Sequence, residues 1–213
     1  FRPHYLQILS NTITSNGAQF GIVVTGHNPL SVSAIRDNSI DMTGNSIGRA
    51  GIGIFDSKID LSCNTISGNV PTQNANFTYG IVGSNSTGVW ACNSVARTQT
   101  GVFFDGFNSV NLRGTRFNKH STGLVINTSA SIGLEEFRGN MYLGLLHRVT
   151  NPDAIDLGGA SLLRINATPP STLLPNNYAT NQTFIEVVTF GTNFDCNSPQ
   201  LVCGVTLPQL VAP

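Results

Sequence analysis

The sequence predicts an all-β fold built as a β-solenoid, in which short strands wind into stacked coils. Two patterns, one containing Asn and one containing Gly, alternate through the first part of the chain, and no segment shows a helical period. The composition agrees, because 23 Asn and 22 Gly stand beside few helix-forming residues in the 213-residue chain.

The first pattern has the form apolar-x-apolar-x-small-Asn-x-apolar and predicts a turn between two short strands. Its asparagines are Asn11, Asn45, Asn64 and Asn93. Looser copies place Thr115 and Glu135 at the same position. Equivalent residues of successive coils stack about 4.8 Å apart, so we expect these asparagines to form a ladder of amide hydrogen bonds.

The second pattern is a glycine followed by an apolar residue that opens a short strand. It occurs at Gly21, Gly53, Gly80, Gly101, Gly123 and Gly144. Together the two patterns predict about six coils, which must stack to bury their apolar faces. Longer excursions near 26–38 and 69–79 predict loops that carry a specific surface.

The Asn-containing pattern resembles the repeats of right-handed parallel β-helix proteins, the pectin-lyase-like fold, over residues 5–146. The resemblance is carried by Asn11-Thr-Ile13, Asn45-Ser-Ile47, Asn64-Thr-Ile66 and Asn93-Ser-Val95. Leu61-Ser-Cys63-Asn64, the segment 139–144 and the two terminal cysteines are also similar to large secreted β-helix proteins of Bacteroidetes, which are cargo of type IX secretion. This resemblance implies an extracellular or cell-surface protein and a fragment of a larger secreted chain.

After residue 146 both patterns end, and prolines alternate with short apolar runs. We therefore expect β-helix repeats in 1–146 and a C-terminal β-rich cap or extension in 147–213, because a solenoid must cover its end. A disordered linker is the alternative.

Four cysteines allow two pairs. We expect a disulfide between Cys196 and Cys203, which would close a loop near the C-terminus of an extracellular protein. Cys63 and Cys92 hold the same phase of successive coils, where a disulfide or two stacked reduced thiols both fit. The spacings do not match a zinc knuckle, so we expect no metal.

The charge balance excludes some partners. The 11 Lys and Arg equal the 11 Asp and Glu, and only 10% of residues are charged. An electrostatic binder of nucleic acid is therefore not expected. No apolar run reaches the roughly 18 residues that a membrane span needs, so we expect no membrane insertion.

Enzymes with the resembled fold use carboxylates stacked on one face to cleave polysaccharides. The acids here are scattered, and Asp56 and Asp105 lie about two coils apart, so we expect no catalytic residues and no cofactor. The densest charged region is a candidate ligand loop, with a salt-bridged loop as the alternative. Its residues are His27, Arg36, Asp37, Asp41 and Arg49.

These observations predict a non-enzymatic extracellular β-helix module with a structural, adhesive or assembly role. Extracellular glycans, other surface or secretion proteins and further copies of the chain are its expected partners. One alternative is a polysaccharide lyase or glycoside hydrolase with catalytic residues on loops or in a missing region. Another is a trimeric phage-type spike.

Overall fold

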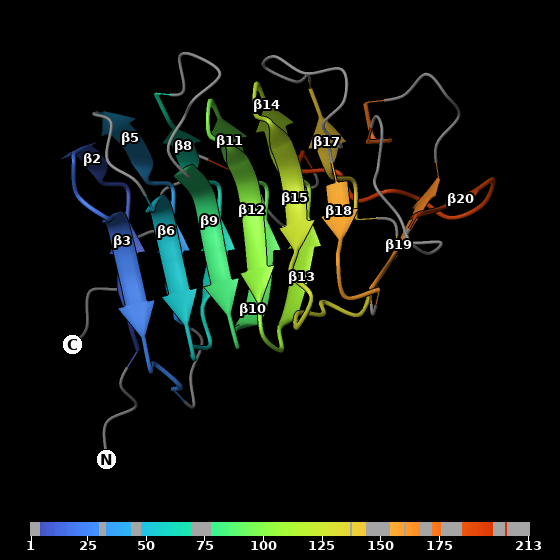
Figure 1. Cartoon of the computed structure of the whole chain (residues 1–213), viewed down its shortest axis with the longest axis horizontal. Helices are drawn as coiled ribbons and strands as arrows, with labels where there is room; N and C mark the ends of the chain where they lie inside the picture. Colours follow the sequence, from blue (N-terminus) through green and yellow to red (C-terminus); the bar gives the residue numbers. More distant parts are fainter. Residues whose placement is uncertain are drawn as a thin grey trace.

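The computed structural model describes residues 5–29, 33–43, 48–69, 78–136, 138–143, 154–159, 161–166, 172–175, 185–197 and 203. All regular structure in these residues is β-strand. Through most of the chain, each strand pairs in parallel with the strand three positions later. The chain therefore winds as a parallel β-helix, and the predicted all-β solenoid is confirmed (Figure 1).

Three all-parallel sheets form the walls of this helix. The first sheet contains β1 (Gln7–Leu9), β4 (Ala34–Arg36), β7 (Asp60–Ser62), β10 (Thr87–Ala91) and β13 (Ser109–Arg113). The second contains β2 (Thr12–Asn16), β5 (Ser39–Thr43), β8 (Thr65–Ser67), β11 (Ser94–Ala96), β14 (Arg116–Asn118) and β17 (Met141–Tyr142). The third contains β3 (Phe20–Thr25), β6 (Arg49–Phe55), β9 (Thr78–Ser84), β12 (Thr100–Asp105), β15 (Thr122–Ile126) and β18 (Ala154–Asp156). With six strands in each of the last two sheets, the prediction of about six coils is also confirmed.

Inward-pointing apolar residues stack in columns that fill the space between the walls. The first sheet contributes Ile8, Ile35, Leu61, Trp90 and Leu112. The second contributes Ile13, Ile40, Ile66, Val95, Phe117 and Tyr142. The third contributes Ile22, Ile52, Ile81, Val102, Leu124 and Ala154. Burial of one such large side chain contributes about 1.5–3 kcal/mol, so these columns supply most of the stability of the solenoid.

A column of glycines lies at the start of the third sheet, where it approaches the second. Its members are Gly21, Gly51, Gly80, Gly101 and Gly123. A Cβ at Gly80 would lie 2.2 Å from Cγ1 of Val95 and 2.5 Å from the carbonyl oxygen of Gly101, so only glycine fits. The prediction that Gly53 holds this position in the second coil is wrong. Ile52 pairs with Ile22, so Gly51 lies in the column.

The corner between the first and second sheets repeats the same two-residue turn. Its first residue has a positive φ, at Ser10, Asp37, Cys63, Cys92, Gly114 and Gly139. Its second residue is Asn11, Asn38, Asn64, Asn93, Thr115 or Asn140. The backbone N–H of Asn11 donates to Oδ1 of Asn38 at 3.0 Å. The same bond joins Asn38 to Asn64 and Asn64 to Asn93, each at 3.1 Å, so an asparagine ladder runs along this corner.

Two members of the ladder differ from those expected. Asn38 occupies the position predicted for Asn45, which lies outside the described residues. Asn38-Ser-Ile40 and Asn45-Ser-Ile47 both place an asparagine two residues before an isoleucine, and the pairing of Ile40 with Ile66 places Asn38 in the ladder. Asn140, rather than Glu135, continues the column, since its Oδ1 accepts the N–H of Thr115 at 2.9 Å.

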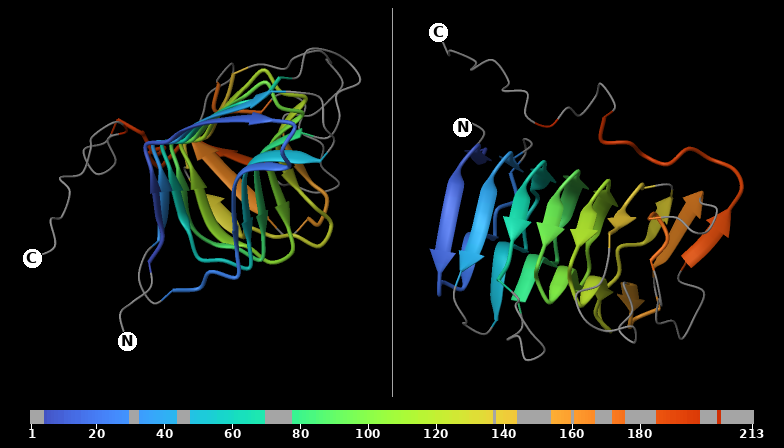
Figure 2. Two further views of the ribbon diagram at one scale, coloured as in Figure 1. Left: turned by 90° about the vertical axis from the view of Figure 1, so that its left-hand side faces the viewer. Right: turned by 90° about the horizontal axis from the view of Figure 1, so that it is seen from above.

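The C-terminal segment returns to this corner, where Phe194 lies against Gly114 and Gly139 (Figure 2). The structure joins Cys92 to Cys196 and Cys63 to Cys203, so the expected Cys196–Cys203 disulfide is wrong. Both alternatives for Cys63 and Cys92, a mutual disulfide and two reduced thiols, are wrong as well. Equivalent Cβ atoms on neighbouring parallel strands stay about 4.8 Å apart. A disulfide needs a Cβ separation of about 3.8 Å, so each corner thiol bonds to the returning segment instead.

A fourth sheet begins in the sixth coil, where β16 (Leu134–Glu136) precedes β17 and β18 along the chain. It contains β16, β19 (Leu162–Asn166) and β20 (Ile185–Val188), all parallel. A row of alternating charge crosses it, in which Arg164 pairs with Glu136 and with Glu186. β18, β19 and β20 all lie after residue 146, in the region expected to be β-rich.

Candidate binding surface

The two turn aspartates considered as catalytic groups accept hydrogen bonds from side chains of the following coil, at the corner after the third sheet. Oδ1 of Asp56 accepts a hydrogen bond from Nδ2 of Asn85 in the next coil at 3.1 Å. Oδ1 of Asp105 accepts from Nδ2 of Asn127 at 3.0 Å and from Oγ of Ser129 at 3.1 Å. Both carboxylates therefore hold adjacent turns together.

The five residues of the predicted ligand loop do not gather into one site. Arg36, at the end of β4, forms an ion pair with the adjacent Asp37 at 2.9 Å, and Asp37 occupies the left-handed corner position. Asp41 points outward from β5, in the second sheet. The Arg36–Asp37 pair thus lies at the end of the first sheet, whereas the Asp41 carboxylate lies on the outer face of the second sheet.

The other two members of that prediction are engaged inside the fold. Arg49 is only 1% exposed. Its guanidinium donates to the carbonyl oxygens of Ser15 at 2.6 Å and Ala18 at 3.0 Å. His27 lies 2.8 Å from Oγ of Ser33 through Nε2. The prediction of a shared ligand loop is therefore wrong, because the coil path distributes neighbours in sequence among different sheets.

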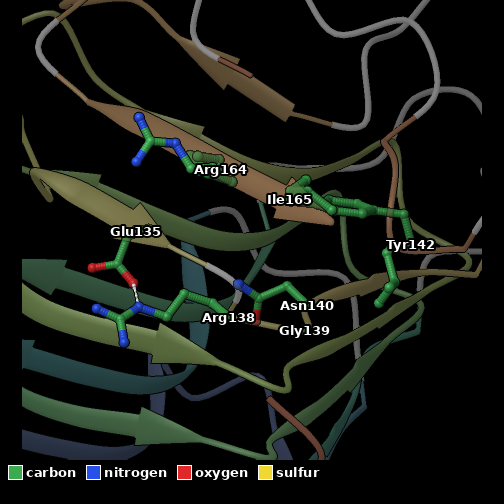
Figure 3. Close-up of a pocket in the computed structure, with 9 residues that line it drawn as sticks. Glu135, Arg138, Gly139, Asn140, Tyr142, Arg164 and Ile165 are labelled. Carbon is green, nitrogen blue, oxygen red and sulfur yellow. Dashed lines mark hydrogen bonds and ion pairs between the residues drawn. The ribbon is translucent and has the colours of Figure 1, made fainter. Parts of the chain in front are cut away.

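A small hollow of about 10 Å³ lies where β16 departs from the first sheet, close to the smallest volume that holds one water molecule (Figure 3). Glu135 lies on it and is 5% exposed. Its Oε2 accepts hydrogen bonds from Nε of Arg138 at 3.0 Å and from the N–H of Leu112 at 3.2 Å. Burial raises the pKa of Glu135 to about 7, although Arg138 and the Leu112 N–H act in the opposite direction. Glu135 thus caps the edge of β13.

The outer faces of the second and third sheets differ sharply in chemistry. Short hydroxyl side chains line the second sheet in a register column of Thr12, Ser39, Thr65 and Ser94. The third sheet instead bears a column of Val23, Gly53, Val82, Phe103, Val125 and Ile155. Alternation along each strand points these residues outward. Val23 is 51% exposed, the four residues Val82, Phe103, Val125 and Ile155 are partly exposed, and Gly53 is buried.

Aromatic rings extend this apolar column. The rings of Tyr79 and Phe103 lie 5.2 Å apart between centroids, and those of Phe20 and Phe55 lie 5.8 Å apart edge to face. A Cβ at Gly53 would lie 2.7 Å from both of the latter rings, so they close over this glycine. We call this surface the apolar face; it consists of Phe20, Val23, Phe55, Tyr79, Val82, Phe103, Val125 and Ile155.

The apolar face spans the third sheet from β3 to β18, which Figure 1 shows face on. None of its eight residues is charged. A contiguous apolar surface on a soluble fold marks a site of interaction more often than a solvated wall. It is therefore the strongest candidate for a functional surface in the described part of the chain.

No three His, Cys, Asp or Glu side chains among the described residues form a group that could hold a metal ion. The same residues contain no helix that could cross a membrane.

No protein-family model matches the chain, and no significant match is found among curated proteins or among solved structures. The class of protein is thus defined by the fold alone, as a disulfide-linked parallel β-helix.

Sequence reasoning missed the apolar face, although a signal was present. The strands of the third sheet contain consecutive apolar residues, as in Ile22-Val-Val24, Val102-Phe-Phe104 and Leu124-Val-Ile126. A half-buried strand alternates apolar and polar residues, whereas an unbroken apolar run predicts apolar character on both faces.

Proposed function

We propose that this chain is a non-enzymatic β-helix module that acts outside the cell or at its surface, in adhesion or assembly. The observation that carries the proposal is the uncharged apolar face, with its paired rings Tyr79 and Phe103. A flat row of aromatic and aliphatic groups on a rigid sheet suits a neutral partner, because it offers dispersion contact without charge pairing.

Neutral glycans are the partner that this chemistry favours. The non-polar faces of sugar rings stack on aromatic side chains, and the repeat of a polysaccharide matches a surface that repeats along the solenoid. Surface or secretion proteins are the second class of partner. The resemblance to secreted Bacteroidetes proteins of type IX secretion is part of this proposal.

The two disulfides support the proposed location. Cys63–Cys203 and Cys92–Cys196 consume every cysteine of the chain. Disulfides form and persist in oxidising compartments and are rare in the cytosol of most organisms. An extracellular or cell-surface location therefore fits the covalent structure.

The test is binding to immobilised neutral polysaccharides, such as cellulose and chitin, by the chain and by matched variants. Val82→Thr with Phe103→Thr keeps β-branched residues on the third sheet but removes apolar surface, and should weaken binding at least ten-fold. The control, Thr65→Val with Ser94→Val on the second sheet, should bind as the original chain does. Equal binding by both variants would refute a role for the apolar face.

A second candidate function is a polysaccharide lyase or glycoside hydrolase, favoured by one observation. Glu135 has a pKa of about 7 beside a hollow, which is the property of a general acid or base. Assays on acidic and neutral polysaccharides decide this point. Turnover that Glu135→Gln abolishes without unfolding the chain would establish the enzyme in place of the adhesive module.

A further inference from the structure

The two disulfides are nested in the sequence. The outer bond, between Cys63 and Cys203, spans 140 residues, and the inner bond, between Cys92 and Cys196, spans 104 residues within them. The Cα atoms of the two pairs are nevertheless only 5.3 and 5.7 Å apart. Each bond therefore provides a short covalent path between two points that the main chain joins by a much longer route.

Most of the solenoid lies on the longer route. Cys63 follows β7 in the third coil, and all strands from β8 to β20 lie between Cys63 and Cys203. Only β1 to β7 precede the outer bond. Figure 2 shows the coils in sequence order along one axis, so the outer bond connects the C-terminal part of the chain to a coil in the interior of the solenoid.

Tension applied across the outer bond follows this covalent path. A pull on any point before Cys63 and on any point after Cys203 passes from β7 through the two sulfur atoms into the C-terminal part of the chain. The segment between the two cysteines carries none of that tension, because the bond holds its ends together. If the outer bond opens, the inner bond gives the same protection to the segment between Cys92 and Cys196.

Without the disulfides, the same pull would unfold the coils one after another. Each coil of a solenoid contacts only its neighbours, so the loss of one coil exposes the next to the load. In the described part of the chain, β1 pairs only with β4, and β4 pairs with β7. The outer bond stops this sequence of events at Cys63, before β8 is reached.

The protected segment contains most of the apolar face. It also contains the stacked core rings of Trp90 and Phe104, whose centroids lie 5.2 Å apart. Tension that unfolds the first two coils would therefore leave most of the face in place. Five of the eight residues of the apolar face lie between the two cysteines of the outer bond: Tyr79, Val82, Phe103, Val125 and Ile155.

We propose that the nested disulfides make this chain a load-bearing module, in which β8 to β20 stay folded while β1 to β7 unfold under tension. This mechanical function goes beyond binding. It depends on the covalent connections of the chain and on no property of the partner that the apolar face binds.

Single-molecule force spectroscopy of the whole chain, pulled through handles fused to both ends, tests the covalent path. Dithiothreitol reduces each disulfide to two thiols and is itself oxidised to a cyclic disulfide. Reduction should lengthen the fully extended chain by about 490 Å, because the outer bond spans 140 residues at about 3.5 Å each. Cys63→Ser with Cys203→Ser keeps the inner bond, which spans 104 residues, so its reduction should add about 360 Å.

Two results of this experiment would overturn the proposal. A gain of only about 130 Å in the original chain would indicate the pairs Cys63–Cys92 and Cys196–Cys203, which enclose far fewer residues. An unchanged length would mean that no disulfide shortens the loaded chain.

A second measurement asks whether the protected segment stays folded. Trp90 is the single tryptophan of the chain and is 0% exposed within this segment. In a hydrogel cross-linked through both ends of the chain, stretching should leave the emission maximum of Trp90 unchanged while the disulfides are intact. Stretching after reduction should shift the maximum to the red. A red shift in the stretched, oxidised gel would overturn the proposal, whatever the stability of the reduced chain.

The proposed binding function is tested separately. Binding to cellulose or chitin is measured without load, and both mechanical measurements need no ligand. Loss of glycan binding would therefore leave the load path standing, and the results that overturn the load path would leave the apolar face standing.

Discussion

Cys63 and Cys203 are joined by a disulfide across 140 residues of sequence, with their Cα atoms 5.3 Å apart. Cys92 and Cys196 form the second link, across 104 residues. Cys63 and Cys92 occupy the same corner position in adjacent coils. The two disulfides therefore attach the C-terminal part of the chain to this corner of the solenoid. Phe194 of the C-terminal segment stacks on Arg113 of β13, with the guanidinium carbon 4.5 Å from the ring centroid.

Removal of the second link should loosen that attachment. Cys92→Ser with Cys196→Ser should lower the free energy of unfolding by about 2–4 kcal/mol, because a long loop of the unfolded chain is no longer closed. Urea denaturation measures the change. Limited proteolysis should then cut segment 185–197 earlier than in the original chain. Mapping of peptides under non-reducing conditions checks the pairing, and a Cys196–Cys203 peptide would contradict it.

The asparagine ladder should be strong at its centre and weak at its end. Asn64 is fully buried and its Nδ2 donates to the Ile35 carbonyl oxygen at 2.9 Å. Asn64→Ala leaves buried backbone groups without partners and should cost about 2–4 kcal/mol in the free energy of unfolding. Asn11→Ala, at the exposed end, is the matched control and should cost under about 1 kcal/mol. Equal losses in the free energy of unfolding for the two variants would contradict a stabilising role of the buried ladder bonds.

The glycine column should not tolerate a methyl group. Gly80→Ala places Cβ against Val95 and the Gly101 carbonyl oxygen, and should destabilise the fold by about 3 kcal/mol or more. Gly26→Ala is a useful comparison, because nothing lies within 4 Å of its Cβ position but its φ is +65°. That change should cost only about 1–2 kcal/mol, the conformational cost alone. Thermal unfolding distinguishes the two.

We expect the ionisation of Glu135 to lower the free energy of unfolding as the pH rises. Burial raises its pKa from 4.5 to about 7, so the folded chain keeps a proton that the unfolded chain has already released. The stabilisation is complete below pH about 4.5 and is lost as the pH rises through about 7, with a change of up to about 3 kcal/mol. Glu135→Gln should flatten this dependence in urea titrations between pH 4 and 8. Glu186→Gln, on the exposed row of the fourth sheet, should leave it in place.

The sequence pattern identified the corners of the solenoid. It did not always distinguish between two asparagines that lie close together in the sequence. Asn38 and Asn45 both precede Ser-Ile, and the two choices differ by a shift along the strand. Pairing of Ile35 with Leu61 decides for Asn38, because this register buries both side chains fully. The candidate ligand loop failed for a related reason, since a coil sends neighbouring residues of the sequence to different sheets.

The sequence by itself determined the class of fold, because stacked coils require small residues, turn-forming asparagines and apolar positions at matching phases, and those remain visible in a linear pattern. It also contained the unbroken apolar runs that become the apolar face. Only the tertiary structure decided the disulfide pairing and the contacts of the C-terminal segment with the corner of the coils. These depend on a C-terminal segment that returns across the coils, and contacts of such long separation leave no periodic signal in the sequence.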